Sequence, residues 1–143
     1  MLLLPRKGTL AIAAVLDIAL HADGQPVAAK ALANRHHLPP RHLEPVLQAL
    51  VRIGILRGVR GPRGGYELAR DSTDISANDI LRAAGTVEAA DGPAGDGPAL
   101  LTHVVVPILE EAEQALAEAL SKITIADLAQ LAEDGGSRAG RSD

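Results

Sequence analysis

The sequence predicts a mainly α-helical fold that carries a small two-stranded sheet and ends in a long helix. The chain has 143 residues, 47% of them hydrophobic, and Tyr66 is its single aromatic residue. Its core must therefore be built from Leu, Ile, Val and Ala, a composition that favours helices. Helical spacing of apolar residues runs through most of the chain, and one glycine-rich ribbon interrupts it at residues 55–68. The length suits one core with an appended element.

Charge is distributed unevenly along the chain. Residues 1–70 hold ten Lys and Arg against four Asp and Glu, a net charge of +6, whereas residues 71–143 hold four against fourteen, a net charge of -10. A basic half on an acidic whole is typical of a protein with one face that meets a polyanion, although a chance asymmetry of solvated faces is the alternative. The absence of cysteine excludes disulfides, thiolate metal sites and cysteine nucleophiles.

The first predicted helix covers residues 9–21 and has apolar side chains on nearly every side. This pattern predicts burial from more than one direction, so we expect the helix to lie between the amino-terminal motif and a pairing element. Asp17 interrupts its apolar run, which is too short to span a membrane, and no secretory signal precedes it. We expect a cytoplasmic protein without a membrane partner.

Two further helices and a tight turn follow. Residues 27–36 have apolar side chains at helical spacing, residues 37–40 form a turn, and Pro40 stands at the start of the next helix, where a missing N–H does no harm. Gly54 ends that helix. Its apolar face consists of Leu43, Val46, Leu47, Leu50, Val51 and Ile53.

The polar residues at the start of this second helix are candidates for DNA recognition. Arg41, His42 and Glu44 point away from the apolar face, and side chains at this place in a helix-turn-helix reach base edges in the major groove. Arg41 can donate two hydrogen bonds to guanine, and Glu44 can accept one from cytosine or exclude a phosphate. A solvated helix end is the alternative, but the context favours DNA contact.

A basic ribbon comes next in the chain. Residues 55–60 and 66–68 are predicted to form two short strands around a turn of Gly, Pro and Arg at residues 61–65. Such a ribbon can enter a minor groove, and its candidate contacts are Arg57, Arg60, Arg63 and Gly64. The glycines match neither a dinucleotide fingerprint nor a Walker loop, and no catalytic motif is present, so we expect no enzyme.

The carboxyl-terminal half predicts a loop and a pairing helix. Residues 76–84 form a short helix with Ser76 as its cap, and residues 85–99, which repeat Asp-Gly-Pro-Ala, form a flexible loop. Residues 101–123 form a long helix, regular from about Val106 because of Pro107. Its apolar seam alternates at four and three residues, as in helix pairs: Val105, Leu109, Ala112, Leu116, Ala119 and Ile123.

These patterns predict four parts of the chain. Residues 1–84 form a winged helix-turn-helix domain for DNA binding, and residues 85–99 form the flexible loop. Residues 100–132 form the dimerisation helices, and residues 133–143 form a disordered tail rich in Gly, Ser and Arg.

Several segments together resemble the Rrf2 family of bacterial transcriptional regulators. The resemblance extends to about residue 131, and it is most specific in the ribbon and in the late Ile-Thr-Ile-Ala-Asp-Leu at residues 123–128. The ribbon match covers residues 59–70, and the other matching segments are Lys7-Gly8, residues 16–21, Leu43-Glu44, residues 79–83 and residues 101–103.

This resemblance implies a homodimer, expected to be a repressor, that binds a palindromic site in double-stranded DNA. The two recognition helices would enter successive major grooves, and a wing arginine would enter a minor groove. By this resemblance, Lys7 is expected to contact a DNA phosphate. Residues 40–44 resemble the base-reading segment of the family, in which Pro40 is followed by Arg41, His42 and Glu44 at the base-reading positions. Arg60 and Arg63 resemble the wing residues that contact DNA.

The chain departs from the family in two ways that bear on function. Pro45 stands inside the recognition helix and removes one backbone hydrogen bond, so this helix is expected to bend or to start late. Many relatives hold an iron-sulfur cluster with three cysteines and a nearby histidine, but this chain has no cysteine. We therefore expect no cofactor and no metal, with His103 a weak candidate for a metal contact.

Two other functions are consistent with the sequence. The chain could be a dimeric protein-interaction module that has lost DNA recognition, as Pro45 suggests. It could also be a regulator that responds to a small-molecule effector, bound in a pocket between the helix at residues 9–21, the long helix and the loop.

Overall fold

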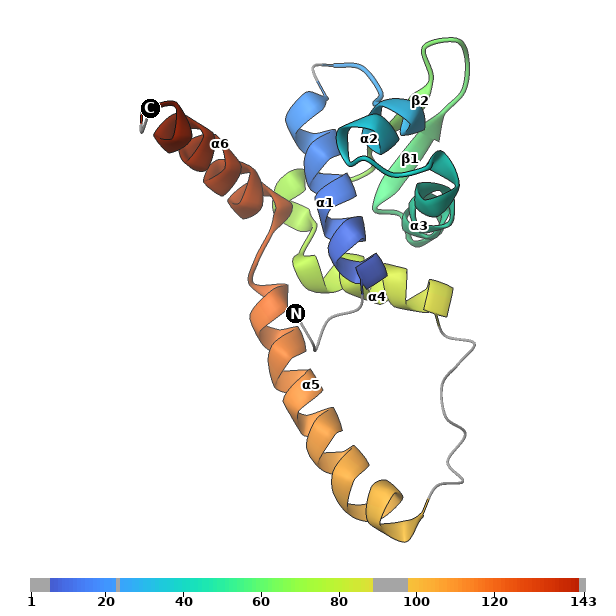
Figure 1. Cartoon of the computed structure of the whole chain (residues 1–143), viewed down its shortest axis with the longest axis vertical. Helices are drawn as coiled ribbons and strands as arrows, with labels where there is room; N and C mark the ends of the chain where they lie inside the picture. Colours follow the sequence, from blue (N-terminus) through green and yellow to red (C-terminus); the bar gives the residue numbers. More distant parts are fainter. Residues whose placement is uncertain (1–5, 23, 89–97, 142–143) are drawn as a thin grey trace.

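The computed structural model describes residues 6–22, 24–88 and 98–141. These residues form a mainly helical fold with one small antiparallel sheet, as predicted (Figure 1). The elements in order are α1 (Arg6–His21), α2 (Ala29–Arg35), α3 (Pro40–Ile53), β1 (Leu56–Val59), β2 (Gly65–Leu68), η1 (Ser72–Asp74), α4 (Ala77–Glu88), η3 (Leu101–Val105), α5 (Val106–Ser121) and α6 (Ile125–Arg141).

Helix α1 forms the centre of the molecule. It packs against α4, α6 and the sheet, and also meets α3 (Figure 1). One set of its apolar residues is completely buried, and a second set is partly buried against the same core. The first set is Ala11, Ala14, Val15 and Ile18, and the second is Leu10, Ile12, Leu16 and Ala19. Burial from more than one direction is therefore confirmed.

The wing is a β-hairpin tied to the body by a third segment. Strand β1 pairs with β2 in antiparallel register, with Val59 opposite Gly65. Val27 then exchanges two backbone hydrogen bonds of 2.8 Å with Tyr66. This bridge fastens the hairpin to the chain just before α2, so the base of the wing is fixed relative to the helix-turn-helix.

The helix-turn-helix is shaped by a backbone turn that ends α2. His37 adopts a left-handed conformation with φ of 53°, and the Leu38 N–H donates to the Ala33 carbonyl over 2.9 Å. These two features are those of a Schellman motif with His37 in place of the usual glycine. Helix α3 then begins at Pro40 and continues through Pro45, so the predicted late start is wrong. Gly54, with φ of 89°, ends α3 as predicted.

Two reciprocal caps join the starts of α4 and α6. The Ser76 hydroxyl accepts from the Asp79 N–H over 3.1 Å, and the Asp79 carboxylate accepts from the Ser76 N–H over 3.2 Å. Thr124 and Asp127 repeat this capping box at α6, and Ser76 bridges Thr124 between the two. The predicted Ser76 cap is confirmed, and the chain returns to the body at this bridge.

Helices α4 and α6 both extend beyond their predicted ends. Helix α4 runs to Glu88, so the first residues of the predicted loop at 85–99 are helical, and residues 89–97 lie outside the described residues. Helix α6 runs to Arg141, beyond residue 132, where the pairing helices were predicted to end and the tail at 133–143 to begin. Both helices start from a capping box, and no proline follows within them to stop propagation.

Helix α5 extends away from the body (Figure 1) and has no buried residue. It begins at Val106, as Pro107 predicted, after a turn of π-helix in η3. Within the predicted seam, Leu116 is half-buried and the other five residues are exposed. Val104 and Ile108, which the seam did not include, are also exposed, at 53% and 61%. No helix of the described part has both the length and the apolar character needed to cross a membrane.

Candidate nucleic-acid interface

The first turns of α3 present three polar side chains to solvent. Arg41, His42 and Glu44 are exposed, whereas Leu43 and Val46 are completely buried. The buried pair anchors α3 on the core, and because the helix rotates by about a third of a turn per residue, the polar residues between them face outward. The predicted orientation of these three residues is therefore confirmed.

A groove connects the start of α3 to the start of α1. It has a volume of about 690 Å³, and both Lys7 and Arg41 line it. Its lining combines cationic with apolar side chains, and consists of Arg6, Lys7, Leu10, Leu38, Arg41, His42, Pro45 and Val46. No carboxylate is in this lining, so the positive charge is available to an anion.

The wing carries two kinds of arginine. Arg57 lies opposite Glu67 in the hairpin, and its Nε and Nη2 atoms are each 2.9 Å from Glu67 Oε1. Arg60 and Arg63 are exposed and form no ion pair with any residue that the structure describes. Arg57 is thus partly neutralised, whereas the two arginines near the turn keep their full charge.

Gly64 shapes the wing turn. Its N–H donates to the Gly61 carbonyl over 2.9 Å, and Gly61 has φ of 116°. A Cβ at Gly64 would collide with the Val59 carbonyl oxygen. Gly64 also lines a hollow of about 390 Å³ beside Arg60 and the start of α2. Only glycine fits at this position, so the geometry of the turn is enough to explain why a glycine occurs there, and no DNA contact is needed to explain it.

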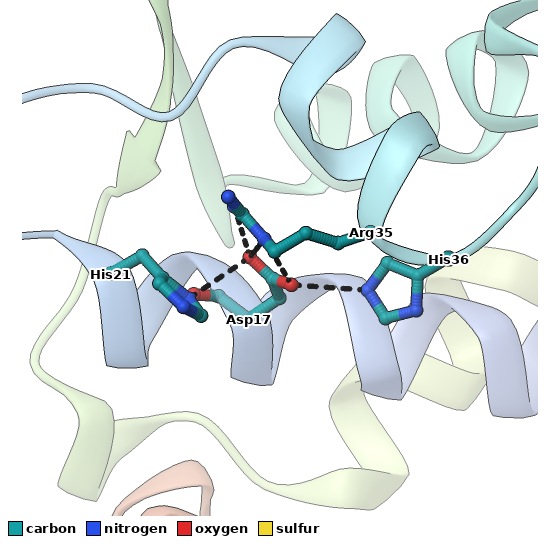
Figure 2. Close-up of polar contacts among 4 residues, drawn as sticks. All are labelled: Asp17, His21, Arg35 and His36. Carbon is teal, nitrogen blue, oxygen red and sulfur yellow. Dashed lines mark hydrogen bonds and ion pairs between the residues drawn. The ribbon is translucent and has the colours of Figure 1, made fainter.

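The structure reveals a polar cluster around one buried carboxylate that the sequence did not predict (Figure 2). Asp17, 8% exposed, lies on α1 and accepts three hydrogen bonds from Arg35: Nη2 donates to Oδ1 over 2.6 Å, and Nε donates to Oδ2 over 2.9 Å and to Oδ1 over 3.1 Å. His36 Nε2 lies 3.2 Å from Asp17 Oδ2, and His21 Nδ1 lies 3.2 Å from Asp17 Oδ1. In sequence, Asp17 interrupts an apolar run, and its partner Arg35 is 18 residues away.

Arg35 decides the charge state of Asp17. Burial by itself would raise the pKa of the Asp17 carboxyl, but the hydrogen bonds and charge of Arg35, with smaller contributions from His21 and His36, outweigh burial and lower that pKa below 3.8. Asp17 is therefore a carboxylate at neutral pH. It is linked to Arg35 by the bidentate geometry that fixes both side chains most firmly.

Comparison with known proteins identifies the family of this chain. A family model for Rrf2, described as an iron-dependent transcriptional regulator, matches residues 4–131. The chain belongs to the Rrf2 family. It is 32% identical over 130 residues to the HTH-type transcriptional regulator IscR of Vibrio cholerae, covering 87% of this chain and 73% of that protein. It is also 32% identical over 117 residues to protein rrf2 of Nitratidesulfovibrio vulgaris, covering 80% and 78%.

Solved structures agree with this assignment. T. potens IscR superposes with a TM-score of 0.72 at 32% identity, covering 92% of this chain and 89% of that one. CymR of B. subtilis superposes with a TM-score of 0.68 at 24% identity, which supports the fold alone. The Rrf2-family chain is thus a winged helix-turn-helix transcriptional regulator and not an enzyme.

The residues of this chain do not fit the iron-sulfur cluster that the family resemblance implies. Such a cluster is held by thiolates, and the chain has no cysteine. Among the described residues, no three His, Asp or Glu side chains converge to hold a metal ion. His103 is exposed in η3, far in sequence from the other histidines.

Proposed function

We propose that this Rrf2-family chain is a repressor that binds a palindromic DNA operator as a homodimer, in the cytoplasm. The observation that carries this proposal is the exposed start of α3, where Arg41, His42 and Glu44 project from a helix whose opposite face is buried. This is the geometry by which a recognition helix reads base edges in a major groove.

Phosphate and minor-groove contacts complete the proposed interface. Lys7 shares a groove with Arg41, which places it to bind the backbone beside the recognition helix. Arg60 and Arg63, exposed and free of ion pairs within the described chain, are the wing residues proposed for the minor groove. In Figure 1, α3 and the wing lie on the right of α1 and α6 lies on its left, so DNA can approach without meeting α6.

The exposed apolar surface of η3 and α5 supports the homodimer. Six large apolar residues follow at helical spacing, each at least 42% exposed: Leu100, Leu101, Val104, Val105, Ile108 and Leu109. We refer to them as the α5 patch. A contiguous apolar patch of this kind marks an interaction surface. Pairing two copies through it would present two recognition helices to two half-sites.

The proposed function is tested by selecting bound sequences from a random duplex pool with the full chain at physiological salt. We expect a palindromic site with two half-sites. Its affinity should fall steeply with salt, because bound arginines and lysines displace counterions from phosphates. In vitro transcription from a promoter that overlaps this site should decrease when the protein is added. A folded dimer that enriches no sequence would instead support a protein-interaction module.

A further inference from the structure

The polar cluster around the buried Asp17 connects α1 to the end of α2. On α1, Asp17 and His21 face the contact, and on the other side Arg35 is the last residue of α2 and His36 follows it (Figure 2). These are the charged and titratable groups that face the Asp17 carboxylate in the described structure, and no buried side-chain nitrogen or oxygen there is left without a partner.

Stability alone does not explain a charged group at this position. The neighbouring core residues of α1 are Ala14, Val15 and Ile18, and an apolar residue in place of Asp17 would continue that surface. An ion pair between a buried carboxylate and a partly exposed guanidinium contributes little net stability, because solvent screens the attraction and desolvation of the carboxylate offsets it. What the pair does supply is a defined orientation, since Nε and Nη2 of the planar Arg35 guanidinium contact both carboxylate oxygens side-on.

That orientation is transmitted to the recognition helix over a short, rigid path. His36 leads directly into His37, whose backbone is left-handed, and Pro39 and Pro40 then fix the backbone where α3 begins. Arg41 is therefore six residues from Arg35, with little rotational freedom between them. Lys7 lies two to three helical turns before Asp17 on the same helix, α1. The Asp17 carboxylate therefore links the helix that carries the proposed phosphate contact, Lys7, to the segment that leads to the proposed base contact, Arg41.

We propose that Asp17 is a positioning residue, and that its pair with Arg35 is a latch that fixes α3 relative to α1 and thereby sets operator discrimination. This inference rests on the proposed DNA-binding function. It assigns a recognition role to two residues that need not touch DNA. Loss of the latch should reduce binding to the operator while leaving the phosphate contacts to any duplex in place.

The test compares affinities for the selected operator and for a random duplex of equal length, at a temperature where circular dichroism shows each variant fully folded. For Asp17→Asn we expect operator affinity to fall about tenfold with random-duplex affinity unchanged, since coupled residues typically contribute on this scale. Asp74→Asn makes the same chemical change on an exposed residue and should leave both affinities unchanged.

A double-mutant cycle separates the latch from a direct contact of Arg35 with DNA. Arg35→Gln should reproduce the loss in Asp17→Asn, and the double variant should lose no more than either single variant. If Asp17→Asn does not fold, Arg35→Lys provides the same test because it keeps the charge and removes the fork.

Three outcomes would overturn the latch: wild-type discrimination in Asp17→Asn, a parallel loss of both affinities, or additive losses in the cycle. A wild-type chain that does not discriminate would overturn the proposed function itself and the latch with it.

Discussion

At the scale of single residues, the wing allows a paired arginine to be compared with one that has no ion pair in the described structure. Arg57 is paired with Glu67 at 2.9 Å, whereas Arg60 is exposed without an ion pair in the described structure. If the wing binds DNA by charge, Arg60→Ala should weaken operator binding by about 1–3 kcal/mol. Arg57→Ala should have a smaller effect, because it also releases Glu67. Fluorescence anisotropy with the selected operator measures both variants, and equal losses would contradict this assignment.

Asp17 also predicts how stability depends on pH. The hydrogen bonds and charge of Arg35 hold the pKa of the Asp17 carboxyl below its unfolded value of 3.8, so the folded state binds its proton less readily. The stabilisation is therefore complete above that value and is lost as pH falls through the lower, folded-state pKa. Urea denaturation should show wild type losing more unfolding free energy than Asp17→Asn between pH 6 and pH 3. Parallel losses would show that Asp17 does not contribute.

The start of α3 and the polar cluster around Asp17 differ in how much of them could be predicted from the sequence. The exposure of Arg41, His42 and Glu44 follows from the spacing of the buried residues in α3, because the position of a residue in a helix determines the face on which its side chain lies. Asp17 was not predicted as a site residue. Its role depends on contact with Arg35, which comes from another helix, and spacing within α1 contains no information about that contact.

At the scale of elements, Pro45 gives a prediction for α3. It lies inside a helix that is nevertheless continuous from Pro40 to Ile53, and its ring nitrogen cannot donate to the Arg41 carbonyl. Pro45→Ala restores that donor at an exposed position and should stabilise the protein by about 1–3 kcal/mol. Thermal unfolding measures the gain. Operator affinity should be maintained, and a large gain in affinity would show that Pro45 impairs the recognition helix.

The ends of elements were predicted where a residue imposes them. Gly54 ends α3, Pro107 sets the start of α5, and Ser76 caps α4, each through its own backbone or side-chain chemistry. Composition was a weaker guide at the end of α6. The residues from 133 onward have the composition of a loop, but they follow a capped helix without a proline and continue it to Arg141.

At the scale of the whole molecule, the helical spacing of α5 predicted an apolar seam but not its width. The predicted seam contains Val105 and Leu109, and the structure adds Val104 and Ile108 as exposed neighbours. Val104 with Val105, and Ile108 with Leu109, are adjacent pairs that repeat every four residues. A seam counted as one residue per turn includes only one member of each pair, so the α5 patch is wider than the predicted seam.

The α5 patch leads to a prediction about assembly. Leu109, 58% exposed, lies within it, and Leu109→Glu would place a charge where the proposed dimer excludes water. We expect sedimentation velocity to show a monomer at concentrations where wild type is a dimer, because the new carboxylate would have to be desolvated in both copies. Circular dichroism should be unchanged, since no residue of α5 is buried in its own chain.

Gln114→Glu adds the same charge to an exposed residue off the predicted seam and should remain dimeric. The Leu109→Glu monomer should bind a single half-site more tightly than a random duplex and should lose the added affinity of the full palindrome, because each chain keeps its own recognition helix and wing. A dimeric Leu109→Glu variant would place the dimer interface elsewhere. A monomer with undiminished affinity for the palindrome would show that two linked recognition helices are not required.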